Sequence, residues 1–313
     1  MSARRAGIVL CGGLSSRMGR AKAWLPWFGG RVMIEHVVHA LAPAVDEVIV
    51  VRSAEMALPN LPGNARIVAD REPARGPLAG IRDALSATDA EAAFVTSTDA
   101  PFLTADYVDS LFAFSEGRAC APVEDGFMQV LSAIYPGDAR AAAQALLDAG
   151  KGRPRALLES LSCRTLDAEA DAVSGVEAYA EAAGEGGVDI GRPGRRAWTG
   201  FNTPDAYLSC VREVDPEAKA TLVLEEESAA DRRVRIPVGT LGEFLETGAK
   251  ALGQSGRGWE AEGALANSIR VRLGDAPDSP DACSLDLPVG PGENVRLSLR
   301  PSAREMKAQN GDR

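Results

Sequence analysis

Histidine is nearly absent from this sequence, and cysteine is scattered. The 313 residues include two histidines, His36 and His39, and five cysteines. The cysteines are odd in number and lack Cys-x-x-Cys spacing, which argues against a disulfide framework and against a zinc site. Both histidines fall on the polar side of a run with helical periodicity, so we expect them at the surface. The sequence therefore argues against a serine–histidine triad and against a histidine-rich metal centre.

Long apolar runs and an excess of positive charge are also missing. No stretch is long or apolar enough to span a bilayer, and the basic residues 4–5 lead into an apolar run too short for a secretion signal. We therefore expect a cytoplasmic protein without a membrane partner. The net charge of −10 disfavours nucleic acid as a partner, because phosphate neutralisation needs clustered basic side chains.

A glycine-rich, basic loop directly follows the first apolar run. Residues 6–10 predict a short buried strand, and the loop CGGLSSRMGRAK occupies residues 11–22. Gly12 and Gly13 lack Cβ atoms, so their backbone can turn tightly and approach a ligand. Arg17 offers a planar fork of donors to phosphate oxygens, and Lys22 adds a mobile charge. The loop predicts a phosphate site at the carboxyl end of a strand; the alternative is an ordinary strand-to-helix turn with surface charges.

Strand-like and helix-like runs alternate as far as residue 212. We expect strands at 47–51, 66–70, 92–96 and 127–135, and helices at 31–41, from 76, from 104, at 139–147, within 151–158 and at 205–212. This alternation predicts an α/β fold, a mostly parallel sheet with helices on both faces.

A different pattern begins after residue 214. We expect strands at 221–224 and 233–238, a helix at 241–252, and strands at 269–273, 284–287 and 295–299. Such an order indicates a small α+β domain. We therefore divide the chain into an α/β domain (1–214), an accessory domain (215–300) and a polar tail (301–313) that we expect to be disordered.

Polar side chains follow several of the predicted strands. Asp70 ends one strand, Asp99 follows another, and Asn202 precedes a helix. Strand ends at one edge of a parallel sheet converge in space, and Mg²⁺ is commonly held by one or two carboxylates with substrate phosphates. Asp99 is thus a candidate magnesium ligand; the alternative is a turn that enters a helix. The basic residues Arg153 and Arg155 near a helix start suit an anion, or else belong to a solvated loop.

The loop and the motifs after it resemble a known family. Gly-Gly-x-Ser-x-Arg-Met-Gly followed by Lys22 is similar to the signature of the nucleotidyltransferase superfamily, and within it most to the molybdenum cofactor guanylyltransferases. The resemblance covers about residues 6–212. It includes Gly-Pro-Leu-Ala-Gly at 76–80, Asp-Ala-Pro at 99–101 and Asn-Thr-Pro at 202–204. It implies a Rossmann-like fold with Mg²⁺ as the cofactor, bound by Asp99.

The resemblance also implies an activity, which is transfer of GMP from GTP to the terminal phosphate of molybdopterin with release of pyrophosphate. The catalytic residues would be Arg17, Lys22 and Asp99. We add Arg153 as a candidate ligand of the molybdopterin phosphate. The other implied contacts are to the nucleotide at Leu10, Cys11, Gly12, Gly13, Lys22, Asp70 and Asp99, and to the acceptor at Gly80 and Asn202. By the same resemblance, the Gly-Gly pair favours guanine over cytosine.

Three positions depart from the family pattern. Ala21 replaces the usual Asp before the lysine, Val51 stands at a base-side position that is often Asn, and Gly200 stands where a second Asn often precedes Asn202. These departures keep two alternatives open. One is the same chemistry with CTP or with another phosphorylated acceptor. The other is a non-catalytic nucleotide-binding module that acts as a regulator or adaptor.

The accessory domain has its own resemblance. Its element order resembles the β-grasp sulfur carriers of molybdopterin synthesis. Those carriers end in Gly-Gly, whereas this sequence ends in Gly311-Asp312-Arg313, which argues against a carrier role. The other interpretation is a docking or dimerisation module, with other molybdenum cofactor biosynthesis or acceptor proteins as its partners.

Overall fold

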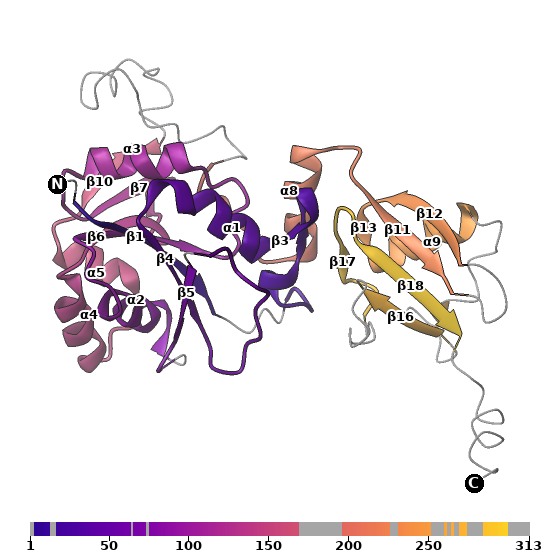
Figure 1. Ribbon diagram of the computed structural model, residues 1–313, viewed down its shortest axis with the longest axis horizontal. Helices are drawn as coiled ribbons and strands as arrows, with labels where there is room; N and C mark the ends of the chain where they lie inside the picture. Colours follow the sequence, from indigo (N-terminus) through magenta and orange to yellow (C-terminus); the bar gives the residue numbers. More distant parts are fainter. Residues whose placement is uncertain are drawn as a thin grey trace, which may run out of the picture. The chain divides into compact units, whose positions relative to one another are not determined.

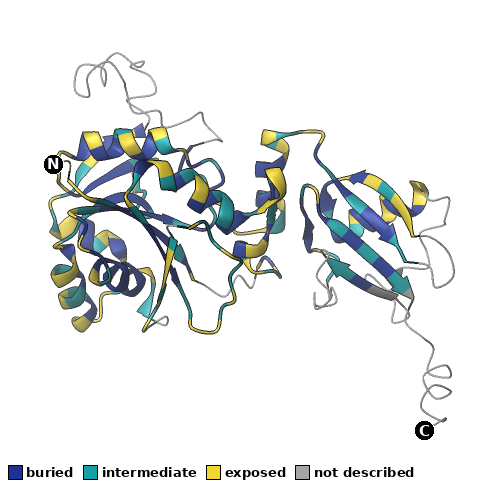
Figure 2. Cartoon of the chain, in the orientation of Figure 1, coloured by how far each residue is buried: buried dark blue, intermediate teal, exposed yellow. Residues whose placement is uncertain are grey.

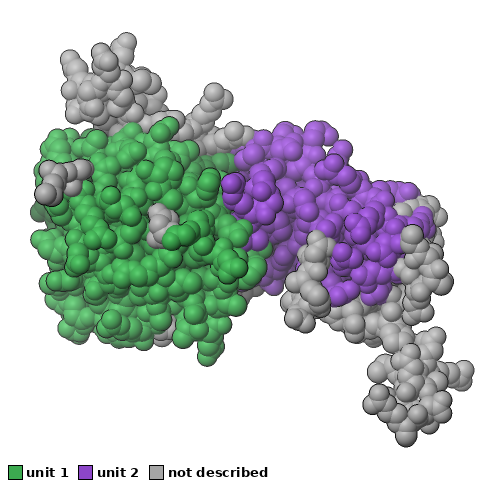
Figure 3. Space-filling model, viewed as in Figure 1, with its two compact units in different colours: residues 1–14, 22–24, 33–200 green, residues 15–21, 25–32, 201–313 purple. Residues whose placement is uncertain are grey.

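The chain divides into two compact units (Figure 3). Unit 1 comprises residues 1–14, 22–24 and 33–200, and unit 2 comprises residues 15–21, 25–32 and 201–313. The computed structural model describes residues 3–12, 17–63, 65–72, 75–168, 196–225, 231–251, 260–261, 264–265, 269–273 and 284–299. Gly13, a predicted nucleotide contact, lies outside these residues. The tail 301–313, which we predicted to be disordered, also lies outside them.

Unit 1 is built on an eight-stranded sheet with the order β10-β7-β9-β6-β1-β4-β5, to which β8 adds beside β7 (Figure 1). Neighbours from β6 to β5 run parallel, as do β10 and β7, while β9 is antiparallel to β6 and β7. The mostly parallel sheet predicted from the alternation is therefore present. Its strands are β1 (Arg5–Cys11), β4 (Glu47–Arg52), β5 (Ala65–Ala69), β6 (Ala92–Ser97), β7 (Cys120–Glu124), β8 (Phe127–Met128), β9 (Ser132–Pro136) and β10 (Arg164–Asp167).

Helices cover both faces of this sheet. The helix α1 (Met33–Leu41) contacts α3 (Ala105–Ser115), while α2 (Pro77–Ser86) and α5 (Pro154–Ser160) each contact α4 (Ala139–Asp148) (Figure 1). Figure 2 shows the central strands buried between these layers, as expected for apolar, β-branched strands of a parallel sheet. Local sequence explains the helix starts. Gly76 has a φ of 83° before α2, a left-handed conformation that favours glycine, and Thr104 caps α3 by accepting from the Tyr107 N–H.

Parts of the sheet differ from the sequence prediction. The single strand predicted at 127–135 is two strands, β8 and β9, separated by a turn in which Ser132 N donates to Gln129 O. The strands β7 and β10 were not predicted; β10 is half-exposed, so it lacks the apolar run of a buried strand. His39 is exposed as predicted, whereas His36 is half-buried, with Nε2 at 2.8 Å from Pro101 O.

Unit 2 contains a four-stranded sheet of order β12-β11-β18-β16. Its central strands β11 (Lys219–Leu224) and β18 (Asn294–Leu299) are parallel, and β12 (Arg232–Pro237) and β16 (Ile269–Leu273) pair antiparallel outside them. The helix α9 (Leu241–Ala251) packs closely on this sheet, because a Cβ on Gly248 would lie 2.3 Å from Leu222 Cδ2. Unit 2 is therefore a small α+β arrangement of a hairpin, a helix and a central parallel pair.

Shorter elements complete both units. The predicted strand at 284–287 is instead a turn, and pairing begins one residue later in β17 (Pro288–Val289), which joins β13 (Gly239–Thr240). Residues 22–32 form η1 (Lys22–Trp24), β2 (Pro26–Trp27), η2 (Phe28–Gly30) and β3 (Arg31–Val32). The remaining short elements are η3 (Ala42–Ala44), β14 (Glu260–Ala261) and β15 (Ala264–Leu265). No helix in the described ranges is long and apolar enough to cross a membrane.

The helix α8 (Pro204–Val214) groups with unit 2 by its contacts, although the sequence pattern placed it in a domain ending at 214. It contacts β13 and β17, and the Tyr207 hydroxyl donates to Pro26 O. Thr203 caps the helix by accepting from the Ala206 N–H. A change of pattern along the sequence cannot reveal such contacts, so the boundary at residue 214 stays a prediction.

Candidate active site

The carboxyl ends of four parallel strands form one edge of the unit 1 sheet. Leu10 of β1 is in register with Val51 of β4 and with Ser97 of β6. Directly after β5, Asp70 donates its N–H to Arg52 O at 2.8 Å. The end of β1, the end of β4 and the residues after β5 and β6 therefore share this edge, which is where open α/β sheets bind ligands.

An ion pair joins the basic loop to the end of β6. Lys22 Nζ, at the start of η1, lies 2.5 Å from Asp99 Oδ2. The hydroxyl of Ser97 donates to the other carboxylate oxygen, Asp99 Oδ1. The Lys22 and Asp99 side chains are 18% and 16% exposed. The pair is therefore largely sheltered, and two charge-assisted hydrogen bonds fix the orientation of the carboxylate.

Gly200 leaves room beside this carboxylate. A Cβ on Gly200 would lie 3.3 Å from the Asp99 carbonyl oxygen, a tight contact, and 3.6 Å from Asp99 Cγ and 3.7 Å from Asp99 Oδ1. The residue is exposed, so its missing side chain keeps that side of Asp99 open. The departure from the family pattern thus removes a polar side chain and adds space.

The arrangement suits a magnesium ion that shares its ligands with a substrate. Within the described ranges, no group of three or more His, Cys, Asp or Glu side chains could hold a metal. Asp99 offers one carboxylate, and the exposed residue beside it, Gly200, has no side chain to cover it. Because Mg²⁺ is usually held by one or two carboxylates, waters and substrate phosphates, this donor set fits it.

A second group of predicted residues meets at the start of α2. A Cβ on Gly80 would lie 3.3 Å from Leu10 Cδ2, 3.4 Å from Val51 Cγ1 and 3.8 Å from Asp70 Oδ2. The structure therefore brings Leu10, Asp70 and Gly80 together. Val51 lies in the same group, where its buried apolar side chain offers no hydrogen bond to a base.

Asp70 has a perturbed environment. Burial raises the pKa of its carboxyl group, the hydrogen bond from Glu72 N at 2.9 Å opposes that rise, and the negative charge of Asp83 adds to it. Asp70 therefore accepts a proton more readily than an exposed aspartate.

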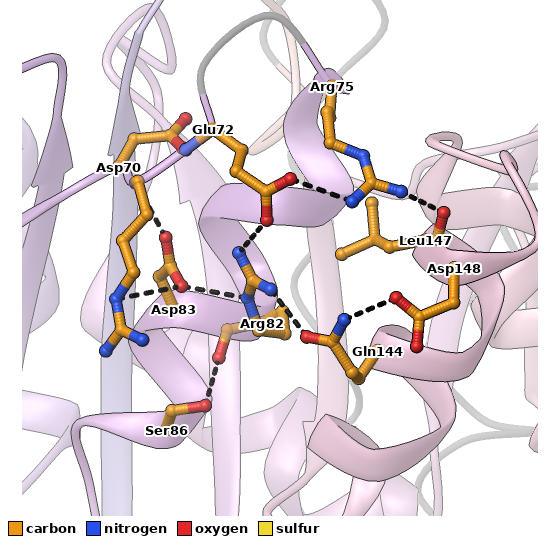
Figure 4. A network of polar contacts seen from close by, with 10 residues as sticks. Asp70, Glu72, Arg75, Arg82, Asp83, Ser86, Gln144, Leu147 and Asp148 are labelled. Carbon is orange, nitrogen blue, oxygen red and sulfur yellow. Dashed lines mark hydrogen bonds and ion pairs between the residues drawn. The ribbon is translucent and has the colours of Figure 1, made fainter.

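A network of charges underlies the segment after Asp70 (Figure 4). Asp83 of α2 has no exposed side-chain surface and lies 2.8 Å from Arg82 Nε. Arg82 also donates to Glu72 Oε1 at 3.1 Å and to Gln144 Oε1 at 2.5 Å, and Arg75 donates to Glu72 Oε2 at 2.8 Å. The network links α2, α4 and the chain that follows β5, so it stiffens one side of the site.

Cys11 and Gly12 follow one another at the end of β1 but differ in environment. Cys11 is 3% exposed, with its Sγ 3.5 Å from Met56 Sδ. Burial raises the pKa of its thiol, so any nucleotide contact made by Cys11 involves its backbone. Among the described residues, nothing lies within 4 Å of a Cβ built on Gly12.

The other predicted site residues are exposed. Arg17 lies in a turn and Asn202 precedes α8, and both belong to unit 2. Arg153 directly precedes α5, at the helix start that the basic segment predicted. Arg155 Nε lies 2.7 Å from Glu159 Oε1, which leaves Arg153 the better anion ligand of the two.

Sequence reasoning missed two parts of this site. Ser97 orients Asp99, and the only signal for it was a polar residue two positions before the carboxylate at a strand end. The second is the buried pair of Arg82 and Asp83. Its signal was two adjacent opposite charges within an otherwise apolar helix.

A glycine-rich, basic loop after the first strand of a mostly parallel sheet, with its lysine paired to an aspartate after another strand, is the arrangement expected of a nucleotidyltransferase. The comparisons with known proteins make the assignment more specific. The family model described as MobA-like NTP transferase domain matches residues 7–166, and the chain belongs to this family.

Named relatives and a solved structure agree with this family. The chain is 35% identical over 162 residues to a probable molybdenum cofactor guanylyltransferase from Mycobacterium tuberculosis (strain ATCC 25618 / H37Rv), covering 50% of this chain and 79% of the relative. It is 31% identical over 185 residues to a protein of the same name from Haloferax mediterranei, covering 56% and 87%. The fold is similar to molybdopterin-guanine dinucleotide biosynthesis protein A from Archaeoglobus fulgidus, with a TM-score of 0.50 and 20% identity over 68% of this chain and 99% of that one.

Proposed function

We propose that this protein transfers GMP from GTP to the terminal phosphate of molybdopterin, forming the guanine dinucleotide cofactor and releasing pyrophosphate. The relatives support this substrate pair, since they are named as probable molybdenum cofactor guanylyltransferases and are 31–35% identical. The observation that carries the proposal is the pair of Lys22 and Asp99 at the carboxyl edge of the sheet.

The proposed reaction is an in-line displacement at phosphorus. A phosphate oxygen of molybdopterin attacks the α-phosphorus of GTP, a new P–O bond forms, and the bond between the α-phosphorus and its bridging oxygen breaks. Pyrophosphate leaves with that electron pair. The acceptor supplies the nucleophile, so the protein contributes positioning and charge neutralisation.

Lys22 and Asp99 would divide this work. Asp99 is the residue that would hold Mg²⁺, which when bound supplies positive charge to the phosphate oxygens. The Lys22 ammonium can donate either to Asp99, as it does at 2.5 Å, or to a phosphate oxygen of the nucleotide. Ser97 holds the Asp99 carboxylate in place during that exchange.

The remaining roles follow from the family resemblance, except that of Arg153, which follows from the basic segment at the start of α5. Arg17 would balance the charge on the departing pyrophosphate, and Asp70 would contact the nucleotide. Gly80 and Asn202 would contact the acceptor, and Arg153 its phosphate. No described residue lies within 4 Å of a Cβ built on Gly12, which supports a close approach of the nucleotide to the backbone there.

The direct test is to incubate the full chain with GTP, Mg²⁺ and molybdopterin, and to detect the dinucleotide by mass together with pyrophosphate. We expect both products with GTP and neither with Asp99→Asn. Product with CTP or with another phosphorylated acceptor, but none with GTP and molybdopterin, would refute the substrate assignment. Nucleotide binding without release of pyrophosphate from the nucleotide, whichever phosphorylated acceptor is added, would instead support the non-catalytic module.

A further inference from the structure

Arg20, two residues before Lys22, is held by a carboxylate of the accessory domain. Its guanidinium forms a bidentate pair with Glu293, with Nη2 at 2.8 Å from Oε1 and Nη1 at 3.1 Å from Oε2. Nη1 also donates to Pro288 O at 2.9 Å. The side chain of Glu293 is 3% exposed and that of Arg20 is 17% exposed. Such a sheltered fork-to-fork pair is stronger and more directional than an exposed ion pair.

The turn that carries Glu293 is shaped for this contact. Gly290 N donates to Glu293 Oε2 at 3.1 Å, so the carboxylate is held from its own side as well. On the other side, Gly19 has a φ of +64° and packs tightly, because a Cβ there would lie 2.6 Å from Leu287 Cδ2. Gly19 and Arg20 therefore both rest on residues 287–293.

The segment after Lys22 is held by the same unit. The Tyr207 hydroxyl donates to Pro26 O, and a Cβ on Gly290 would lie 2.9 Å from Pro26 Cβ. Residues 15–21 and 25–32 belong to unit 2, whereas residues 22–24 between them belong to unit 1. The three residues that carry Lys22 are thus flanked along the chain by two segments that the accessory domain and α8 contact.

Arg20 is therefore engaged differently from the other arginine of the loop. Both terminal nitrogens of its guanidinium bind residues of the accessory domain. Arg17 is exposed and makes no ion pair within the described part of the chain. The basic loop thus contains one arginine that anchors it and one that faces solvent.

We propose that Glu293 is a positioning residue for nucleotide binding, which acts by holding Arg20 and thereby fixing the segment that leads into Lys22. The accessory domain then serves to preorder the phosphate-binding loop. A loop ordered in advance binds its ligand more tightly, because less conformational freedom is lost on binding. The kinetic part of this inference rests on the proposed function, whereas the ordering of the loop rests on the contacts alone.

The test compares Glu293→Gln with Glu225→Gln in the full chain. Glu293→Gln keeps the shape of the side chain and removes its charge. Glu225→Gln is the matched control, because Glu225 is another accessory-domain carboxylate that pairs with two arginines, Arg272 at 3.0 Å and Arg296 at 3.4 Å. Thermal unfolding establishes that each variant is folded.

Two measurements then follow the loop and the reaction. Hydrogen exchange of peptides covering residues 10–24 should be faster in Glu293→Gln and unchanged in Glu225→Gln. In the transfer assay, Glu293→Gln should raise KM for GTP about fivefold or more and leave kcat within about twofold, since preordering affects binding rather than the chemical step. Arg20→Lys, which keeps the charge and loses the planar fork, should change both readouts in the same direction and by less.

The outcomes separate this inference from the proposed function. Wild-type loop exchange and wild-type KM in both Glu293→Gln and Arg20→Lys would overturn the inference and leave the transfer activity standing. Faster loop exchange in a protein that transfers no GMP would refute the activity and retain the ordering. Equal loosening of the loop by Glu225→Gln would also overturn the inference, because the effect would then be general. If Glu293→Gln does not fold, loop exchange and KM for GTP in Arg20→Lys decide whether the inference holds.

Discussion

Asp99 accepts from two residues that lie far apart in the sequence, Lys22 at 2.5 Å and Ser97 from its own strand end. One carboxylate oxygen thus binds the glycine-rich loop, and the other is held by the strand that positions it. Because the lysine and the carboxylate are both charged and both mostly sheltered, replacing either one changes the charge of the site as well as its contacts.

Lys22→Ala should lower the turnover of GMP transfer by about a hundredfold or more, as expected when one preorganised electrostatic group is lost from a phosphoryl-transfer site. The measurement is pyrophosphate release at saturating GTP and molybdopterin. Lys250→Ala is the control, because Lys250 forms an exposed pair with Glu246 on α9 and should keep the wild-type rate. A Lys22→Ala enzyme with a near-normal rate would refute the catalytic role.

Gly12→Ala separates ligand binding from folding. A Cβ at Gly12 meets no atom of the described residues within 4 Å, so we expect the variant to unfold at the wild-type temperature or slightly above it. We expect GTP affinity to fall about tenfold, equivalent to about 1.4 kcal/mol, because the methyl group would occupy the space where the backbone meets the nucleotide. The measurement is the rise in unfolding temperature with GTP concentration.

The control for this variant is Gly63→Ala. Gly63 also has open space around its missing Cβ, but it lies in the loop between β4 and β5, outside the predicted nucleotide contacts. Gly63→Ala should therefore change neither unfolding nor GTP binding. Equal GTP affinity in the Gly12 and Gly63 variants would show that the nucleotide does not approach the backbone at Gly12.

The sequence was informative wherever the signal was local. The apolar run before Gly12 predicted β1, and Asp70 and Asp99 were identified because each follows a β-branched or apolar run. Parallel strands share their carboxyl edge, so a correct strand assignment was enough to place Leu10 and Asp70 at one edge, whereas Gly80 of α2 was identified by the family resemblance. This approach failed for the strand β10, because β10 is half-exposed and has no apolar run to detect.

Contacts between distant residues could not be predicted in this way. Arg20 and Glu293 are charged residues in segments of different pattern, and nothing local marks them as a pair. The same holds for Arg82 and Gln144, which meet only because α2 packs on α4. Pairing of this kind depends on packing geometry, which propensity and periodicity do not encode.

Cys11 should be slow to react with a thiol-alkylating reagent in the native protein. Burial raises the pKa of its thiol, so less thiolate is present at neutral or mildly alkaline pH than for an exposed cysteine, and the thiolate is the reactive form. Peptide mapping after iodoacetamide treatment should find Cys11 modified in the denatured chain and largely unmodified in the folded one. Rapid native modification of Cys11 would contradict the burial of this side chain under Met56.

Asp83→Ala should destabilise the protein by about 3 kcal/mol, near the lower end of the range for breaking a buried ion pair. Asp83 has no exposed side-chain surface, and its removal leaves the 10%-exposed Arg82 without its adjacent carboxylate. The loss stays at the lower end because Glu72 and Gln144 still accept from Arg82. The measurement is the shift in the denaturant midpoint, at an unchanged slope.

Glu159→Ala is the matched control for Asp83→Ala, because it removes the carboxylate of an exposed i,i+4 pair with Arg155. Such a pair contributes about 0.5 kcal/mol or less, so the midpoint should hardly move. Asp83→Ala should also lower the pKa of Asp70, since the Asp83 charge raises it; NMR titration of Asp70 measures that change. A small midpoint shift with an unchanged Asp70 titration would mean that the buried pair does not stabilise the fold. It would also mean that the pair does not affect Asp70 at the carboxyl edge of the sheet.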